Sequence, residues 1–179
     1  MDRMHAIRVL ADWDRLGRHV FTRRDLAKLF ADDDPPAFAA GLRRLVQSGV
    51  LVHACRGVYV NPRAASLDSR VIERIARVLR PGAFSYVSLE SLLSESGAIS
   101  QIPIDRLTVM TTGRKGVYET PYGVIEFTHT KRPAAEVLAG IRQVEDRPLR
   151  IATPAIAWRD LKRVGRNVQL VDAAAVNDG

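Results

Sequence analysis

Hydrophobic residues recur at three- and four-residue spacing through the first fifty positions, which is the pattern of amphipathic helices. The pattern predicts a first helix over residues 3–16. A second helix is expected after Thr22, whose side chain forms a loose capping box with Asp25 three residues later. A third helix is expected between the acidic, proline-rich residues 32–36, which suit a helix start, and Gly49, since glycine is common just after a helix.

The composition then changes to that of β-strands. Val50–Ala54 and Val58–Val60 flank Arg56-Gly57, which is a suitable pair for a tight turn. Val20-Phe21 is expected to add a short strand to this ribbon. Three helices and a basic two-stranded flap predict a winged helix-turn-helix over residues 1–62.

Helical and strand patterns are mixed beyond Asn61-Pro62-Arg63, the predicted domain boundary. Helices are expected over residues 66–79, 88–97, 133–140 and 153–164, and strands over residues 84–87, 106–112, 117–120, 124–130, 143–145 and 149–152. Short turns join the three strands between residues 106 and 130, which predicts an antiparallel meander. The alanine-rich residues 173–179 are expected to be poorly ordered.

The predicted fold class is therefore α+β. It consists of the winged helix-turn-helix, residues 1–62, followed by a small mixed α/β C-terminal domain with an antiparallel sheet, residues 63–179.

The charge balance favours an anionic partner for both parts of the chain. The 27 basic and 20 acidic residues give a net charge of +7. Residues 1–63 contribute 11 basic and 7 acidic side chains, or +4, and the remainder contributes 16 and 13, or +3. Such an excess is common among nucleic-acid-binding proteins, and among other proteins too.

The remaining composition predicts a cytoplasmic protein. Cys55 is the single cysteine, so the chain has neither an internal disulfide nor a thiolate metal cluster, which fits a reducing compartment. No apolar run approaches the roughly 20 residues that span a bilayer. The first residues also lack the apolar block of a signal peptide.

The predicted DNA interface lies on the second and third helices and on the turn of the ribbon. Cations on the second helix and at the turn are expected to meet phosphates, whereas polar residues opposite the apolar stripe of the third helix are candidates to reach base edges. Small residues of the third helix, Gly41 among them, are expected to permit close approach to the DNA. The candidate DNA-binding residues are Arg23, Arg24, Lys28, Arg43, Arg44, Gln47 and Arg56.

A second basic surface is a weaker candidate, and two interpretations remain open for each part of it. Its residues are Arg70, Arg74, Arg77, Arg114 and Lys115. The first three arginines either follow a phosphate backbone or form ion pairs with neighbours such as Glu73. The Gly113–Gly116 segment is either a basic hairpin tip that touches a partner or an ordinary turn; it lacks the spacing of a nucleotide-binding loop.

No catalytic residue, metal site or cofactor is predicted. The four histidines are isolated in sequence, and no serine stands in a nucleophile motif. Glu119, Glu126 and Lys131 loosely resemble the acidic and lysine set of a nuclease, but their spacing does not match. We therefore expect that the protein is not an enzyme.

Three segments in this order are similar to the AbiEi family, the antitoxins of type IV toxin–antitoxin systems that act in abortive infection, a form of phage defence. The segments are Gly49–Tyr59, Tyr86–Leu93 and Thr153–Leu161. The resemblance implies a winged helix-turn-helix repressor that binds repeats in its own promoter. It also implies a C-terminal domain that counters a genetically linked nucleotidyltransferase-like toxin, without a stable complex between the two proteins.

Three functional hypotheses follow. The first is this DNA-binding repressor and antitoxin, acting as a dimer or as a cooperative assembly on double-stranded DNA. The second is an interaction module that neutralises or scaffolds a partner protein without binding DNA. The third is an enzyme that acts on nucleic acid through the C-terminal domain.

Overall fold

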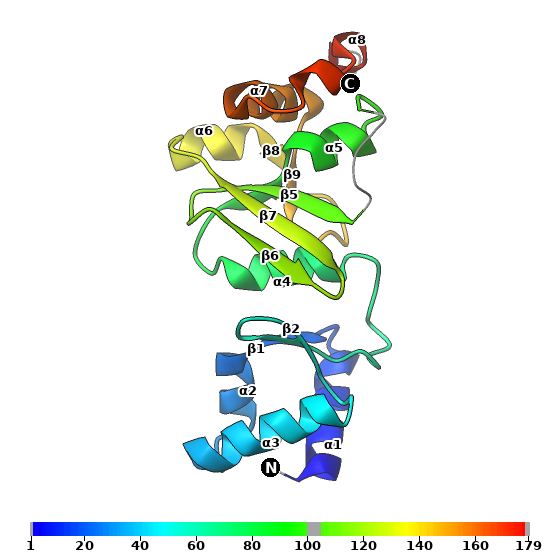
Figure 1. Ribbon diagram of the computed structural model, residues 1–179, viewed down its shortest axis with the longest axis vertical. Coiled ribbons are helices and arrows are strands. Elements are labelled where there is room, and N and C mark those ends of the chain that lie inside the picture. Colours follow the sequence, from blue (N-terminus) through cyan, green and yellow to red (C-terminus); the bar gives the residue numbers. More distant parts are fainter. Residues whose placement is uncertain (1, 100–104, 178–179) are drawn as a thin grey trace. The chain divides into compact units, whose positions relative to one another are not determined.

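The computed structural model describes residues 2–99 and 105–177, and the chain divides into two compact units, Met1–Leu79 and Arg80–Gly179 (Figure 1). Both units combine helices with a β-sheet, so the fold is α+β. The helices of the first unit are α1 (Arg3–Arg15), α2 (Arg23–Leu29), α3 (Pro35–Gln47) and α4 (Val71–Leu79), and its strands are β1 (Val20–Thr22), β2 (Val52–Cys55) and β3 (Val58–Val60).

The second unit also mixes helices and strands along the chain. Its strands are β4 (Ser85–Val87), β5 (Arg106–Thr111), β6 (Gly116–Thr120), β7 (Gly123–His129), β8 (Ile141–Arg142) and β9 (Arg150–Ala152). Its helices are α5 (Leu89–Glu95), α6 (Ala134–Ala139), α7 (Pro154–Val164), a 3₁₀ helix (Val168–Leu170) and α8 (Ala173–Asn177).

The core of the first unit lies between helices α1, α2 and α3 and one face of a small antiparallel sheet. The strands of this sheet are ordered β1-β3-β2. Phe21 and Tyr59 are directly opposite each other on β1 and β3, and both pack against the apolar stripes of the helices. The fully or largely buried residues of this core are Ala6, Leu10, Phe21, Leu26, Phe30, Phe38, Leu42, Leu45, Val50 and Leu51.

The division between the units lies after α4 rather than at residues 61–63, where the sequence predicts it. Helix α4 contacts β1 and β3, and its Val71 and Ile75 are buried. The turn at Asn61-Pro62-Arg63 therefore connects two elements of the same compact unit.

The second unit is built on a six-stranded mixed sheet with the order β6-β7-β5-β4-β9-β8. Strands β5 and β7 are parallel, and among the described strands β6 pairs only with β7. The predicted antiparallel meander is thus wrong, as is an entirely antiparallel sheet. The physical reason is burial: Leu107–Thr111 of β5 are all buried, which suits a central strand, whereas β6 alternates between half-buried and exposed residues and suits an edge.

Helices cover one face of this sheet. Helix α5 contacts β5, α7 contacts β9, and the two helices pack against each other. Figure 1 shows α5, α6 and α7 on the same side of the strands. Helix α7 begins as the sequence predicts, with the Thr153 side chain accepting a hydrogen bond from the backbone of Ile156 (3.3 Å) and Pro154 in the first turn.

Two local predictions for the second unit fail. The strand expected at 143–145 lies instead at Ile141–Arg142. The Gln143 side chain donates hydrogen bonds to the carbonyl oxygens of Val144 (3.1 Å) and Arg147 (2.9 Å), which closes a loop where the strand was expected. The alanine-rich end forms α8 up to Asn177, and the last two residues of the expected disordered tail lie outside the described residues.

Within the described ranges, no helix combines the length and the apolar character needed to cross a membrane.

Candidate nucleic-acid interface

Helix α2 begins with the capping box that the sequence predicts. The Asp25 backbone N–H donates to Thr22 Oγ1 (3.1 Å), and the Thr22 backbone N–H donates to Asp25 Oδ2 (2.9 Å). Arg18 adds an ion pair with Asp25 at 2.9 Å. Burial opposes ionisation of Asp25, but the bonds from Thr22 and the Arg18 guanidinium hold its pKa below the usual value. The start of α2 is therefore held in one geometry.

Helix α3 presents its polar residues outward. Asp34 caps it, accepting a hydrogen bond from the Ala37 N–H at 2.7 Å. At 100° per residue, Arg43 and Gln47 share the stripe opposite the buried Phe38, Leu42 and Leu45, and Arg44 lies at its flank. Because Arg43 and Gln47 are about 6 Å apart along the axis, these side chains form one cluster on the second half of α3.

The expected role of Gly41 in close approach to DNA is wrong. Gly41 is buried, because it falls on the inward side of α3 between Phe38 and Leu45. Among the small residues of this helix, Ala39 and Ala40 lie nearer the outward side, and both are half-buried.

The turn between β2 and β3 lies next to the start of α2. Gly57 adopts a φ of +77°, which glycine accepts without strain, and its carbonyl oxygen accepts a hydrogen bond from the Arg23 backbone N–H at 2.8 Å. The Arg23 guanidinium lies 5.9 Å from the centre of the Phe38 ring in the first turn of α3. Arg56, exposed in the same turn, is thereby placed near the start of α2.

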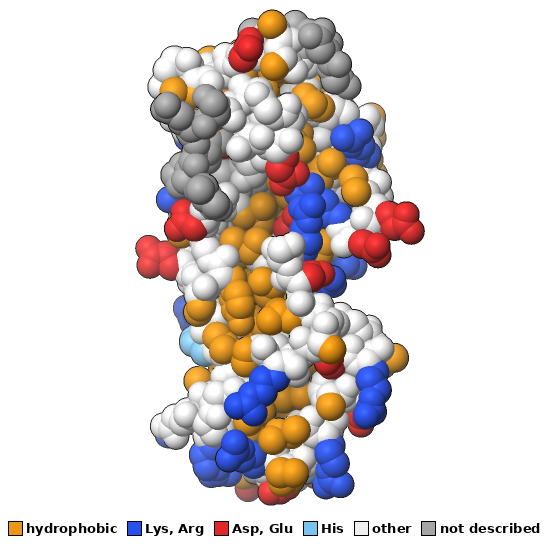
Figure 2. Space-filling model, turned by 90° about the vertical axis from the view of Figure 1, so that its right-hand side faces the viewer, with side chains coloured by type: hydrophobic (Ala, Val, Ile, Leu, Met, Phe, Trp, Pro, Cys, Tyr) orange, Lys and Arg blue, Asp and Glu red, His pale blue; other side chains and the backbone are white. Residues whose placement is uncertain are grey.

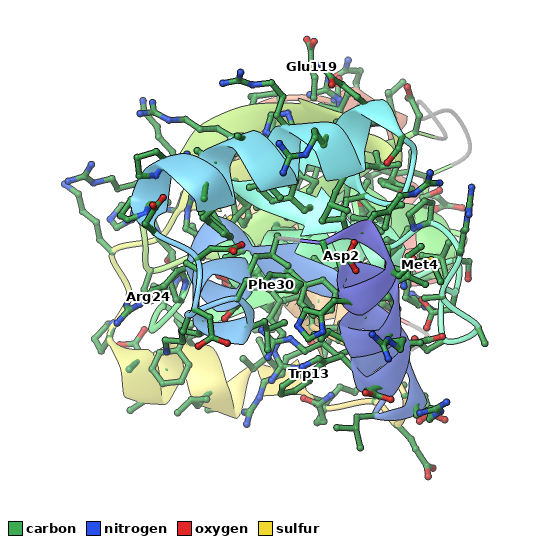
Figure 3. The ribbon with its side chains drawn as sticks, turned by 90° about the horizontal axis from the view of Figure 1, so that it is seen from below. Asp2, Met4, Trp13, Arg24, Phe30 and Glu119 are labelled. Atoms are coloured by element: carbon green, nitrogen blue, oxygen red, sulfur yellow. The ribbon has the colours of Figure 1, made fainter. Side chains whose placement is uncertain are left out.

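All seven candidate DNA-binding residues are exposed. Figure 3 shows the side chain of Arg24 directed away from α2, while Phe30 lies between α2 and α1. Figure 2 shows Lys and Arg side chains on the visible face of the first unit. The acidic residues around Asp34 leave the beginning of α3 negative, so the cations gather at the start of α2, at the β2–β3 turn and along the second half of α3.

The arginines of the second candidate surface that lie in the first unit differ in whether they form ion pairs. Arg70 forms an ion pair with Glu73 (2.8 Å), and Arg74 forms one with Asp68 (2.8 Å). Arg77 is exposed and has no ion pair with any described residue. Two of the three arginines in this row are therefore engaged with carboxylates, which favours the ion-pair interpretation for them.

Arg114 and Lys115 lie in the second unit, on an exposed turn before β6. Arg80 holds this turn: its Nε donates to the Arg114 carbonyl oxygen (2.8 Å), and its guanidinium lies 4.2 Å from the centre of the Phe127 ring. His129 Nδ1 is 2.8 Å from the Gly113 carbonyl oxygen. The turn is thus ordered by its own unit, and its two cations remain directed outward.

One charge network of the second unit is not apparent in the sequence. Glu90 of α5 is 3% exposed and receives two bonds from Arg166, Nε to Oε1 at 2.7 Å and Nη2 to Oε2 at 3.1 Å. Arg166 also binds Glu126 of β7, whose other oxygen pairs with Arg106 at 2.7 Å. Burial opposes ionisation of Glu126, but the two arginines hold its pKa below the usual value.

This network engages one carboxylate of the nuclease-like set. Glu126 was the central residue of the nuclease-like set, and it is occupied by Arg106 and Arg166. Among the described residues, no three His, Cys, Asp or Glu side chains lie close enough to hold a metal ion.

A second buried network joins two of the segments that carry the family resemblance. Asp160 of α7 is completely buried, and its Oδ2 accepts bonds from Tyr86 Oη and Ser88 Oγ, each at 3.0 Å. Arg132 lies 3.5 Å from the other carboxylate oxygen. Burial raises the pKa of Asp160, and the hydroxyl donors and Arg132 only partly counter it. A carboxylate on the apolar stripe of a predicted helix was the signal in the sequence for this site.

The segment that follows β3 is tied back to α1. The backbone N–H groups of Ala65 and Ser66 donate to the two oxygens of Asp14, at 2.7 and 3.0 Å. His19 is completely buried, with Nδ1 2.8 Å from Ser66 Oγ. Burial lowers the pKa of His19, and nearby Arg74 lowers it further. The histidine is therefore neutral in the folded protein near neutral pH.

We expect His19 to destabilise the protein on mild acidification. The unfolded chain binds a proton at His19 below about pH 6.5 while the folded chain does not, so the free energy of unfolding falls by up to about 1.4 kcal/mol per pH unit. This contribution is fully present above that pH and is lost as the pH decreases. His19→Gln removes the titrating group, and its free energy of unfolding should depend less on pH between about 5 and 6.5. Urea titrations across this range measure both slopes; equal slopes would contradict the expectation.

Comparison with known proteins identifies a fold but no family. No family model matches the chain, and no curated protein matches it significantly. The structure is similar to the crystal structure of the Rv2827c protein from Mycobacterium tuberculosis, with a TM-score of 0.59 and 16% sequence identity. The similar region covers 88% of this chain and 60% of that chain, so this chain spans less than two thirds of the length of that protein.

Proposed function

We propose that this protein is a DNA-binding transcriptional repressor and antitoxin of a type IV toxin–antitoxin system. Its first unit is a winged helix-turn-helix in which α2 and α3 form the helix-turn-helix and the β2–β3 turn is the wing. The observation that carries the proposal is the hydrogen bond from Arg23 to the Gly57 carbonyl oxygen. This bond places the exposed cations of α2 and of the turn on neighbouring segments, beside α3.

The division of roles follows from the position of each side chain. The second half of α3 enters the major groove, where Arg43, Arg44 and Gln47 have the donors that read guanine and adenine edges. Arg23, Arg24, Lys28 and Arg56 bind phosphates on either side. The negative start of α3 is kept away from the DNA backbone, so the helix enters at an oblique angle.

The antitoxin part of the proposal is supported by the Asp160 network. Tyr86 and Ser88 belong to one segment similar to the AbiEi family, and Asp160 belongs to another, 72 residues away from Ser88. The two segments thus carry residues that depend on each other physically. We propose that the second unit counters a nucleotidyltransferase-like toxin from the adjacent gene.

Binding to the upstream region of its own operon tests the repressor function. We expect Arg44→Ala to weaken binding to this promoter DNA by about 1–3 kcal/mol more than binding to random DNA, because a base contact is lost. Arg24→Ala should weaken both equally and flatten the plot of log K against log salt by about 0.9, the value for one phosphate contact. Fluorescence anisotropy at several salt concentrations measures both effects.

Arg142→Ala is the matched control, since Arg142 is an exposed arginine of the second unit and lies on β8. It should bind both DNAs as the unchanged protein does. Equal weakening of both DNAs by Arg44→Ala would exclude base reading by that residue. An absence of promoter binding at low salt would reject the repressor function and favour a protein-interaction module.

A further inference from the structure

The six-stranded sheet of the second unit has an open edge at β6. Strand β6 pairs with β7 in a continuous antiparallel register from Gly116↔Phe127 to Thr120↔Gly123. The loop between the strands has two residues, so its closing pair, Thr120 and Gly123, exchanges both backbone hydrogen bonds. Because such pairs alternate, the backbone N–H and C=O groups of Val117 and Glu119 point away from β7, toward the open edge.

The side chains on one face of this edge alternate in a charged and apolar pattern. Lys115 immediately precedes β6, and Lys115, Val117 and Glu119 are two residues apart, so they share a face. All three are exposed, and Val117 is 58% exposed. Figure 3 shows Glu119 projecting away from the ribbon. Among the described residues, none forms a side-chain hydrogen bond or ion pair with these three side chains.

This pattern is complementary to itself. If two copies of β6 run antiparallel around a two-fold axis at Val117, Lys115 of each copy is opposite Glu119 of the other, because both are two residues from the centre. Val117 then packs against Val117. We propose that β6 is a self-association surface through which two copies of this protein join their sheets edge to edge.

The backbone geometry fits the same register. Residues whose polar groups point outward must be opposite each other in an antiparallel pair, and Val117 with Val117 satisfies this condition. Lys115, which immediately precedes β6, would extend the new ladder by one residue opposite Glu119. Gly116 then lies opposite Tyr118, where the absence of a side chain leaves room for the aromatic ring. A register centred on Tyr118 would place Lys115 opposite Pro121, which has no N–H to donate.

The edge lacks two of the features that usually prevent such pairing, a proline and a β-bulge. Proline, a bulge and an inward charge all block edge strands, and β6 has an uninterrupted register without proline from Gly116 to Thr120. Lys115 and Glu119 each face the opposite charge when two copies pair around the two-fold axis. In another register, like charges would face each other and repel. The surface therefore selects a second copy of the same strand over other strands.

Charge reversal and charge exchange test the proposal in the absence of DNA. Sedimentation velocity from micromolar to millimolar protein should show a weak dimer for the unchanged chain. Lys115→Glu alone, and Glu119→Lys alone, should each weaken it by about tenfold or more, because two attractive pairs become repulsive. The double variant Lys115→Glu/Glu119→Lys should restore the original affinity. Lys131→Glu reverses another exposed lysine and should have no effect.

Two further variants report on the backbone and the register. Val117→Pro removes an N–H that does not bond to β7, so it should abolish the dimer while circular dichroism shows a folded chain. In a Cys55→Ser background, Val117→Cys should form a disulfide between copies under oxidising conditions, because Cα atoms of such a pair are about 5.5 Å apart. Lys115→Cys should not, since its own counterpart is distant.

Either of two results would overturn the proposal. A chain that stays monomeric at millimolar concentration has no such surface. A dimer that is unaffected by the single reversals, or that is not restored by the exchange, uses another surface. These outcomes do not depend on DNA binding, so the proposal and the repressor function fail or succeed separately.

Discussion

Replacing Arg166 with methionine should lower the free energy of unfolding of the second unit by about 3 kcal/mol, the lower end of the range for breaking a buried ion pair. Methionine keeps much of the apolar length of the side chain. Among the described residues, it leaves Glu90 with only the Asn167 side-chain amide as a hydrogen-bond donor, 3.0 Å from Oε1. Glu90 is almost completely buried, so its charge has little access to water. The Arg166 side chain is about one third exposed, so solvent screens its charge. We therefore expect a loss of stability at the lower end of that range.

Urea denaturation at neutral pH measures this loss, and a double-mutant cycle assigns its cause. Glu90→Gln combined with Arg166→Met removes both charges, and the double variant should be more stable than the single Arg166→Met variant. Arg159→Met is the control, because Arg159 is an exposed arginine of α7. If Arg166→Met and Arg159→Met had the same small effect, the network would not support the fold.

Replacing Asp160 with alanine should also destabilise the second unit, by about 3 kcal/mol, because several donors lose one acceptor together. Tyr86 and Ser88 are buried, so their hydroxyl groups cannot form replacement hydrogen bonds with solvent. Arg132 would keep its charge without this carboxylate. The raised pKa of Asp160 shows that burial of its charge is costly, so the loss should be smaller than the sum of the three contacts.

Tyr86→Phe removes a single hydroxyl donor and leaves the other contacts of Asp160, so it should cost only about 1 kcal/mol. Comparing the two variants by urea denaturation separates one hydrogen bond from the whole network. A loss below that of Tyr86→Phe would show that Asp160 is tolerated rather than needed. A large loss would explain why the Tyr86–Leu93 and Thr153–Leu161 segments belong together.

The first unit was largely predictable because its signals are local. A capping box, an acidic helix start, a glycine stop and a glycine turn depend on neighbours within a few residues, and the structure contains each of them. The candidate cations were also predictable, since exposure follows from helical periodicity once the apolar stripe is known. Gly41 was predicted to face the DNA because of its small size, but its spacing from Phe38 and Leu45 places it on the buried stripe.

The order of strands in the second unit was not predictable from neighbouring turns. A short turn joins two segments that follow each other in the chain, but it does not determine which strands pair. Strand β7 lies between β6 and β5 because its Ile125 and Phe127 are buried, whereas β6 has no buried residue and suits the edge. Likewise, Glu90 has the appearance of a residue that supports a helix start, and only its distance to Arg166, 76 residues later, reveals a buried ion pair.

The sequence by itself determined most helices and strands, the separation of an apolar and a basic side on α3, and the segments of family resemblance. These properties depend on spacing along one element, where rotation per residue is constant. The tertiary structure alone decided the strand order, the partners of Glu90, Glu126 and Asp160, and the open edge at β6. Those features depend on contacts between residues that are far apart in the chain. Such residues compete for burial and for partners of opposite charge, and the pattern within a single helix or strand does not show which contacts form.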